Sequence, residues 1–98
     1  MKLEEQVEIL EVLACDLSVR PAGAPGPAEL APFVTGRSRE SGAVTYHFRA
    51  EGLAAFEAFA AAERLCCAGL TWTIDAARGA LVIEAEPGQL DALERMFA

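Results

Sequence analysis

The sequence predicts an α+β fold, a mainly antiparallel sheet of about four strands with two helices packed on one face. Three observations predict it. Apolar and polar residues alternate in 43–50, 70–76 and 80–86, which is typical of strands with one buried face. Residues 53–67 are rich in alanine and leucine, which favour helix. The order strand, loop, strand, helix, hairpin, helix leaves neighbouring strands free to pair antiparallel.

Size and charge narrow the class of protein. At 98 residues, the chain is expected to form a single domain over 1–98, and its 53% hydrophobic content argues against disorder. A net charge of −7 disfavours binding of nucleic acid by this chain itself, and of anionic membranes. No apolar run approaches the roughly 20 residues of a membrane span, and the N-terminus lacks the apolar core of a secretion signal. We therefore expect a cytoplasmic protein without membrane contact.

The first 42 residues give the weakest patterns. Residues 1–19 fit either a helix or a strand, and we favour a strand ending near Val19. Residues 20–42 hold four of the five prolines and four of the eight glycines, so a long Pro/Gly-rich loop is expected there. One or two helical turns fit residues 28–34, with Pro27 at a favourable helix start.

The remaining elements follow in order. In 43–50, Val44, Tyr46 and Phe48 share one face of the expected strand, and His47 lies on the other. Glycine after 53–67 ends the helix. Residues 77–79 form a hairpin-sized link that ends in glycine between the two later strands.

Two helical stripes are expected to face the core. Residues 89–98 form a terminal helix whose stripe is Leu90, Leu93 and Phe97. On the helix of 53–67, seven residues fall within an arc of about 140°. These are Leu53, Phe56, Phe59, Ala60, Glu63, Cys66 and Cys67. The sequence thus places two adjacent cysteines and a carboxylate on a core-facing stripe.

Glu63 is the unusual member of this stripe. Burying a carboxylate costs several kcal/mol unless it is paired, hydrogen-bonded, metal-bound or protonated. One interpretation pairs Glu63 with Arg49, Arg64 or a backbone donor at the edge of the stripe. The other interpretation has Glu63 facing a small pocket lined by thiols, within i+3 and i+4 reach of both sulfurs.

Cys66 and Cys67 also admit several interpretations. Both could be small buried hydrophobes, or they could form a strained vicinal disulfide. Nucleophilic catalysis is disfavoured, because a helix C-terminus and Glu63 both oppose a thiolate. His47, the only histidine, is expected on the far side of its strand from the helix. We therefore expect no enzyme and no catalytic residue.

A soft metal ion changes this balance. Coordination deprotonates a thiol outright, and thiolates select thiophilic ions. Cys15 could add a third sulfur if its segment lies beside the helix end. The hypothesis is a site made by Cys15, Cys66 and Cys67, with Glu63 as an auxiliary ligand, for Hg, Cu, Zn or As. The competing hypothesis is a non-enzymatic interaction module that forms a homodimer and buries its cysteines as core residues.

A family resemblance points the same way. "AAERLCCAGLTWTI" resembles the E-x-x-C-C segment and following strand of small, poorly characterised bacterial proteins found near or fused to mercury-resistance-type (MerR-class) regulators. Glu63, Cys66 and Cys67 match the motif, and "ACDLS" resembles an A-C-x-L element that includes Cys15. Ala68–Gly69 departs from the family's usual proline and aromatic residue. The resemblance implies heavy-metal sensing or sequestration, and no established reaction.

Overall fold

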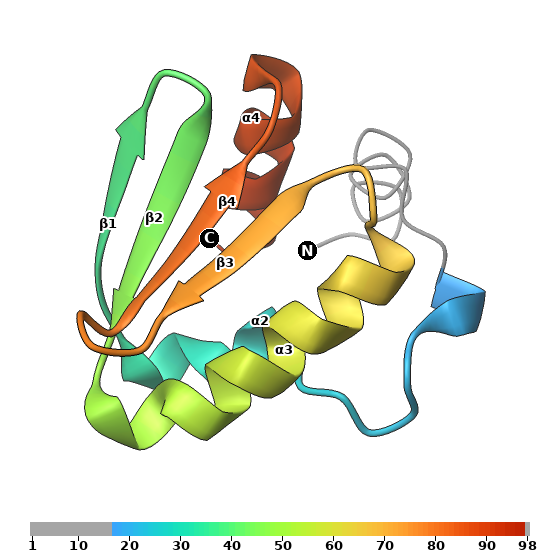
Figure 1. The fold of residues 1–98 in the computed structure, drawn as a ribbon, viewed down its shortest axis with the longest axis vertical. Coiled ribbons are helices and arrows are strands. Elements are labelled where there is room, and N and C mark those ends of the chain that lie inside the picture. The colour runs from blue at the N-terminus through green and yellow to red at the C-terminus, as the bar shows by residue number, and fades with distance from the viewer. Residues whose placement is uncertain (1–16, 98) are drawn as a thin grey trace.

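The computed structural model describes residues 17–97 (Figure 1). Its centre is a four-stranded antiparallel sheet, in which the strands lie in the order β1, β2, β4, β3. The strands are β1 (Val34–Glu40), β2 (Ala43–Phe48), β3 (Thr71–Asp75) and β4 (Ala80–Glu84). The α+β class and the antiparallel sheet are therefore confirmed.

Three α-helices accompany the sheet within residues 17–97, where two were expected. They are α2 (Pro27–Leu30), α3 (Leu53–Cys66) and α4 (Pro87–Met96). The additional helix is the short α2, which begins at Pro27 as its fixed φ favours. Three single-turn 3₁₀ helices complete the described elements: η1 (Leu17–Val19), η2 (Ala31–Phe33) and η3 (Ala50–Gly52).

The expected loop over residues 20–42 is wrong in its second half, because β1 occupies Val34–Glu40. This strand lies at an edge of the sheet and most of its side chains are exposed, so it has no buried apolar face. Ser41 and Gly42 join it to β2 in a two-residue hairpin, with Gly42 at a φ of +80°. Without apolar alternation, only this Ser–Gly pair signalled the strand.

The prediction of a strand that ends near Val19 is also wrong for residues 17–19, the part of it that the structure describes. Residues 17–19 form η1 instead, and the rest of that prediction lies outside the described residues. Two polar residues and a proline surround this turn, and a single helical turn needs no long-range pairing partner.

Glycine has a specific role in the β3–β4 hairpin. Gly79 has a φ of +62°, and a Cβ built there would lie 2.7 Å from the carbonyl oxygen of Phe48. The Gly79 carbonyl in turn accepts a hydrogen bond of 2.8 Å from the Phe48 amide. The turn thus holds the end of β2 by a backbone contact that a larger residue would obstruct.

The core joins the inner side chains of the sheet to α3 and α4. Aromatic rings dominate it: Phe48 stacks on Phe56 at 4.1 Å, and Phe59 meets Trp72 edge to face at 5.9 Å. The expected stripes of both helices contribute, since Phe56, Phe59, Leu90 and Leu93 are all buried. Each such side chain contributes about 1.5–3 kcal/mol by burial. Among residues 17–97, no helix is long and apolar enough to cross a membrane.

Candidate metal centre

The last turn of α3 carries Glu63 and Cys66, and Cys67 follows as its C-cap residue. All three side chains are buried, with Glu63 only 5% exposed, whereas their neighbour Leu65 is 59% exposed. The helical stripe predicted from the sequence is therefore confirmed. A helical period of 3.6 residues places i, i+3 and i+4 on one face, which accounts for the convergence of these side chains.

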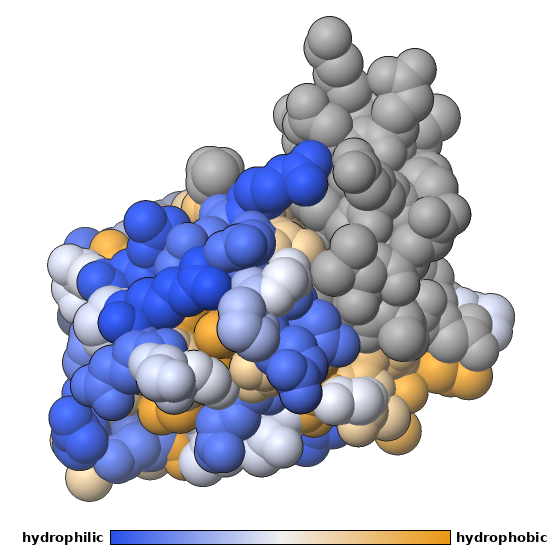
Figure 2. All heavy atoms as spheres, turned by 90° about the horizontal axis from the view of Figure 1, so that it is seen from above, coloured by the Kyte–Doolittle hydropathy of each residue, from blue (hydrophilic) through white to orange (hydrophobic). Residues whose placement is uncertain are grey.

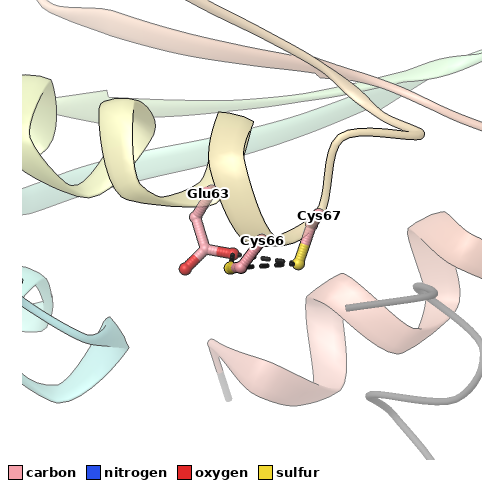
Figure 3. Close-up of side chains that lie close together, drawn as sticks. All are labelled: Glu63, Cys66 and Cys67. Atoms are coloured by element: carbon pink, nitrogen blue, oxygen red, sulfur yellow. Dashed lines mark hydrogen bonds between the residues drawn. The ribbon is translucent and has the colours of Figure 1, made fainter. Parts of the chain in front are cut away.

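Three ligand atoms of this turn form a compact triangle (Figure 3). Oε2 of Glu63 lies 3.5 Å from Sγ of Cys66 and 3.1 Å from Sγ of Cys67. The two sulfurs are 3.7 Å apart. One carboxylate oxygen and two sulfurs thus lie within 4.8 Å of one another in a buried place. We call these three residues the Glu–Cys–Cys cluster.

The end of the helix explains how adjacent residues can point the same way. Side chains of successive helical residues diverge by about 100°. Cys67, however, has left helical geometry, with φ −118° and ψ 56°, although its amide still donates to the Glu63 carbonyl at 2.7 Å. Its own carbonyl accepts a 3.1 Å hydrogen bond from Nε1 of Trp72 on β3. The change of direction occurs at Cys67 itself, before the glycine that was expected to end the helix.

The partner of Glu63 is Arg20. Its guanidinium lies 3.1 Å from Oε1 of Glu63 and also donates to the carbonyl oxygen of Pro25 at 2.6 Å. The expected partners have other contacts: Arg64 donates to the Trp72 carbonyl, and Arg49 to that of Pro32. Arg20 precedes Glu63 by 43 residues, so no local spacing in the sequence indicated this pair.

The two carboxylate oxygens of Glu63 therefore have different roles. Oε1 accepts from Arg20, and Oε2 faces the two sulfurs. The guanidinium carbon of Arg20 also lies 6.0 Å from the centre of the Phe59 ring, a distance suited to a cation–π contact. Arg20 thus fixes the orientation of the carboxylate from the side away from the sulfurs.

The two cysteines differ in oxidation state. Cys66 is a free thiol, whereas Cys67 is disulfide-bonded. The vicinal Cys66–Cys67 disulfide considered from the sequence is therefore not formed. Cys15 lies outside the described residues, so its place in the proposed cluster stays a prediction.

The surroundings of Cys66 disfavour its thiolate. Burial, together with the charge of the Glu63 carboxylate and the hydrogen bond to it, raises the pKa of the Cys66 thiol to about 11, and Arg20 offsets this in part. At neutral pH the thiol is protonated and can donate toward Oε2 of Glu63. Without a metal ion, Cys66 is a poor nucleophile.

His47 adds no nitrogen ligand to the cluster of described residues. It lies on the polar face of β2, where it lines a hollow together with Thr45, Asp75 and Arg78. This placement follows from strand alternation, because Tyr46 and Phe48 on either side of His47 are both buried in the core.

Comparison with protein-family models, curated proteins and solved structures gave no match. The resemblance to the E-x-x-C-C proteins, which covers most of residues 14–98, therefore remains a prediction from the sequence. What the site can do must be argued from its own chemistry.

Proposed function

We propose that this chain, in its reduced form, binds a thiophilic metal ion through Cys66, Cys67 and Glu63. The observation that carries the proposal is the buried triangle of Oε2 and two sulfurs, all within 4.8 Å. Thiolates are the preferred ligands of soft and borderline ions. Sensing or sequestration of such an ion, without catalysis, is the role that this chemistry supports best.

The second cysteine must first be reduced. A dithiol reductant would supply two electrons and two protons, which cleave the disulfide of Cys67 to thiols while the dithiol becomes a disulfide. Reducing conditions of this kind prevail in the cytoplasm, the compartment that we propose. Cys15 is proposed as a further sulfur ligand on the evidence of the sequence.

Metal binding also accounts for the buried carboxylate. Oε1 of Glu63 is satisfied by Arg20, but Oε2 faces the Cys66 thiol, which is a weak donor, and the disulfide sulfur of Cys67, which has no hydrogen to donate. A metal ion on Oε2 would neutralise a charge that these sulfurs solvate poorly. Ligating carboxylates are commonly held by a second hydrogen-bonding group, as Arg20 holds Glu63.

The proposal is tested by equilibrium dialysis of the reduced chain against Hg(II), Cu(I), Zn(II) and As(III), followed by elemental analysis. Wild type should bind one of these ions at one per chain, and Cys66→Ser/Cys67→Ser should not. Leu65→Ser is the matched control, because it alters an exposed residue of the same turn. Equal binding by wild type and the double serine variant would exclude the proposal.

The second candidate is a non-enzymatic module that forms a homodimer. It is supported by the two edge strands: within the described residues, β1 and β3 each pair on one side only. This candidate requires that the helices pack on one face of the sheet. The other face, which carries the exposed Thr73, would then stay open. The free edges could then pair with a second copy.

The described surface favours the first candidate. Large exposed hydrophobic residues within 17–97 are limited to Val19 and Leu65. Figure 2 shows a mainly hydrophilic surface over the described residues at the end of the molecule near α4. Sedimentation velocity separates the candidates: a dimer that is unchanged in Cys66→Ala/Cys67→Ala, with no metal bound by wild type, would favour the module.

A further inference from the structure

We propose that the oxidised chain carries out an intramolecular thiol–disulfide exchange, in which the Cys66 thiol attacks Cys67 and the disulfide moves to join these two adjacent residues. The structure shows the arrangement before exchange, with Cys66 free and Cys67 disulfide-bonded. The chain has three cysteines, so within one chain Cys15 remains to pair with Cys67, and Cys15 lies outside the described residues. This inference concerns the oxidised chain and does not rest on the proposed metal binding.

The two sulfurs are already in contact (Figure 3). Sγ of Cys66 lies 3.7 Å from Sγ of Cys67, because Cys67 has left helical geometry. Exchange proceeds by attack of one sulfur on a disulfide sulfur, and reacting atoms held about 3–3.5 Å apart are close to reaction. A small rotation of the Cys66 side chain covers the remaining distance without movement of the backbone.

Burial leaves Cys66 as the thiol that can reach this disulfide sulfur. Cys67 is 0% exposed and Cys66 is 3% exposed, so a thiol in solution has no access to Sγ of Cys67 in the folded chain. Residues 17–97 contain these two cysteines, and Cys66 is the free one. A reacting group held beside its target acts as though it were present at very high concentration. This proximity offsets the low nucleophilicity of the protonated Cys66 thiol.

Glu63 supplies an acceptor for the proton that must leave Cys66. Oε2 of Glu63 lies 3.5 Å from Sγ of Cys66, within reach of its S–H group. Arg20 holds the other oxygen, Oε1, at 3.1 Å and so keeps the carboxylate directed at the sulfurs. The carboxylate therefore contacts the attacking sulfur and, at 3.1 Å, the sulfur of Cys67 that is attacked.

The exchange needs no added oxidant, because one disulfide and one thiol are present before and after it. The proton of the Cys66 thiol passes to Oε2 of Glu63, a Cys66–Cys67 S–S bond forms, and the S–S bond between Cys67 and its present partner breaks. The displaced sulfur keeps the electron pair of the broken bond and takes up a proton, while Glu63 gives its own up to water. A disulfide between adjacent residues is strained, and strained disulfides are the labile ones, so the exchanged isomer is the minor and more easily reduced one.

Alkylation of the oxidised full chain by N-ethylmaleimide during rapid unfolding in urea tests the exchange, because it labels whichever thiol is free at that moment. Digestion at acid pH, where thiols do not exchange, and mass spectrometry then locate the label. We expect most chains to be labelled at Cys66 and about 0.1–10% at Cys15. In the second group, the peptide that contains Cys66 and Cys67 should be unlabelled and two hydrogens lighter than its dithiol form. Label at Cys66 alone would overturn the proposal.

Cys15→Ser tests whether the exchanged isomer can exist in the folded chain. Refolded from urea with oxidised glutathione, it should lose two electrons and two protons as Cys66 and Cys67 join, and the glutathione disulfide becomes two thiols. Leu65→Ser, at an exposed position of the same turn, should give the same two isomers as wild type, and Cys66→Ser should give no Cys66–Cys67 product.

Circular dichroism selects the folded variants for this comparison. A folded Cys15→Ser chain that carries only thiols or glutathione adducts would also overturn the proposal. Either negative result leaves the binding of a metal ion by the reduced chain to its own test.

Discussion

The two ends of α3 are both buried, but they bury different chemistry. Toward its N-terminus, Phe56 and Phe59 pack against Phe48 and Trp72 in an apolar, aromatic region. At its C-terminus, Glu63 and the cysteines are buried with an arginine. Apolar burial stabilises without direction, whereas every polar group in the second region needs a specific partner. One continuous helical stripe thus buries aromatic rings at one end and polar groups with specific partners at the other.

Phe56→Ala should have the largest effect on stability and should disrupt only the aromatic end of α3. Phe56 is fully buried, so the cavity should lower the free energy of unfolding by about 3–5 kcal/mol in urea denaturation. Leu65→Ala, at an exposed position of the same helix, should change it by less than about 0.5 kcal/mol. Similar losses for the two variants would contradict the packing described above.

Glu63→Ala breaks the polar end. Removing one member of a buried ion pair costs about 3–5 kcal/mol, and we expect about 2–4 kcal/mol here because the Arg20 side chain is 18% exposed. Chemical denaturation of the metal-free protein measures the loss. Arg20→Met/Glu63→Leu should cost less than Glu63→Ala, since no charge is left without a partner. A double variant that is as unstable as the single one would disprove the pairing.

The titration of Cys66 tests the electrostatic difference between the two ends of α3. Burial and Glu63 raise the pKa of its thiol from 9.0 to about 11, so the protonated thiol is favoured in the folded state. Its contribution to stability is complete below pH 9 and is lost as the pH rises toward 11. Alkylation rates at Cys66, followed by peptide mapping, should therefore rise near pH 11 in the folded protein and near pH 9 in urea.

Glu63→Gln is the control for this titration. Because the carboxylate charge is the second cause of the shift after burial, the variant should lower the pKa of Cys66 without restoring it fully to 9.0. Phe56→Ala should leave this pKa in place at temperatures where the variant is folded. If the pKa of the Cys66 thiol is the same in Glu63→Gln as in wild type, Glu63 does not contribute to the shift.

Tyr46→Phe is the smallest change, and it removes a polar group from the apolar region. The Tyr46 hydroxyl is buried and has no hydrogen bond of ordinary geometry within the described residues, although the Arg37 side chain interacts with it electrostatically. Its ring stacks on Phe97 at 4.3 Å, a contact that phenylalanine keeps. The variant should be as stable as wild type or more stable by about 1 kcal/mol, measured by thermal unfolding. A loss of more than about 1 kcal/mol would reveal a hydrogen bond at this hydroxyl.

Periodic segments were the predictable part of the fold. Alternation identified β2, β3 and β4, and the helical period placed Glu63, Cys66 and Cys67 on one buried stripe. β1 was missed, because a polar edge strand gains its place by backbone pairing and needs no apolar face.

The electrostatic partner of Glu63 was beyond sequence reasoning. Arg20 reaches it across 43 positions, from a segment rich in proline and glycine that has no period of its own. Such a contact depends on the path of the folded chain. Similarly, helical periodicity predicts that neighbouring side chains diverge by about 100°, and only the backbone angles of Cys67 explain why the two sulfurs approach each other.

The helix end at Cys67 would give the proposed ion binding a mechanical consequence. Helix ends fray, and their amides exchange with solvent faster than those of the middle turns. An ion held by Glu63, Cys66 and Cys67 would close a second ring around the turn that the Cys67 amide already closes through the Glu63 carbonyl. Binding of the ion would then make this one turn more ordered. Slower exchange of the Cys67 amide hydrogen with solvent would measure whether the ion is bound.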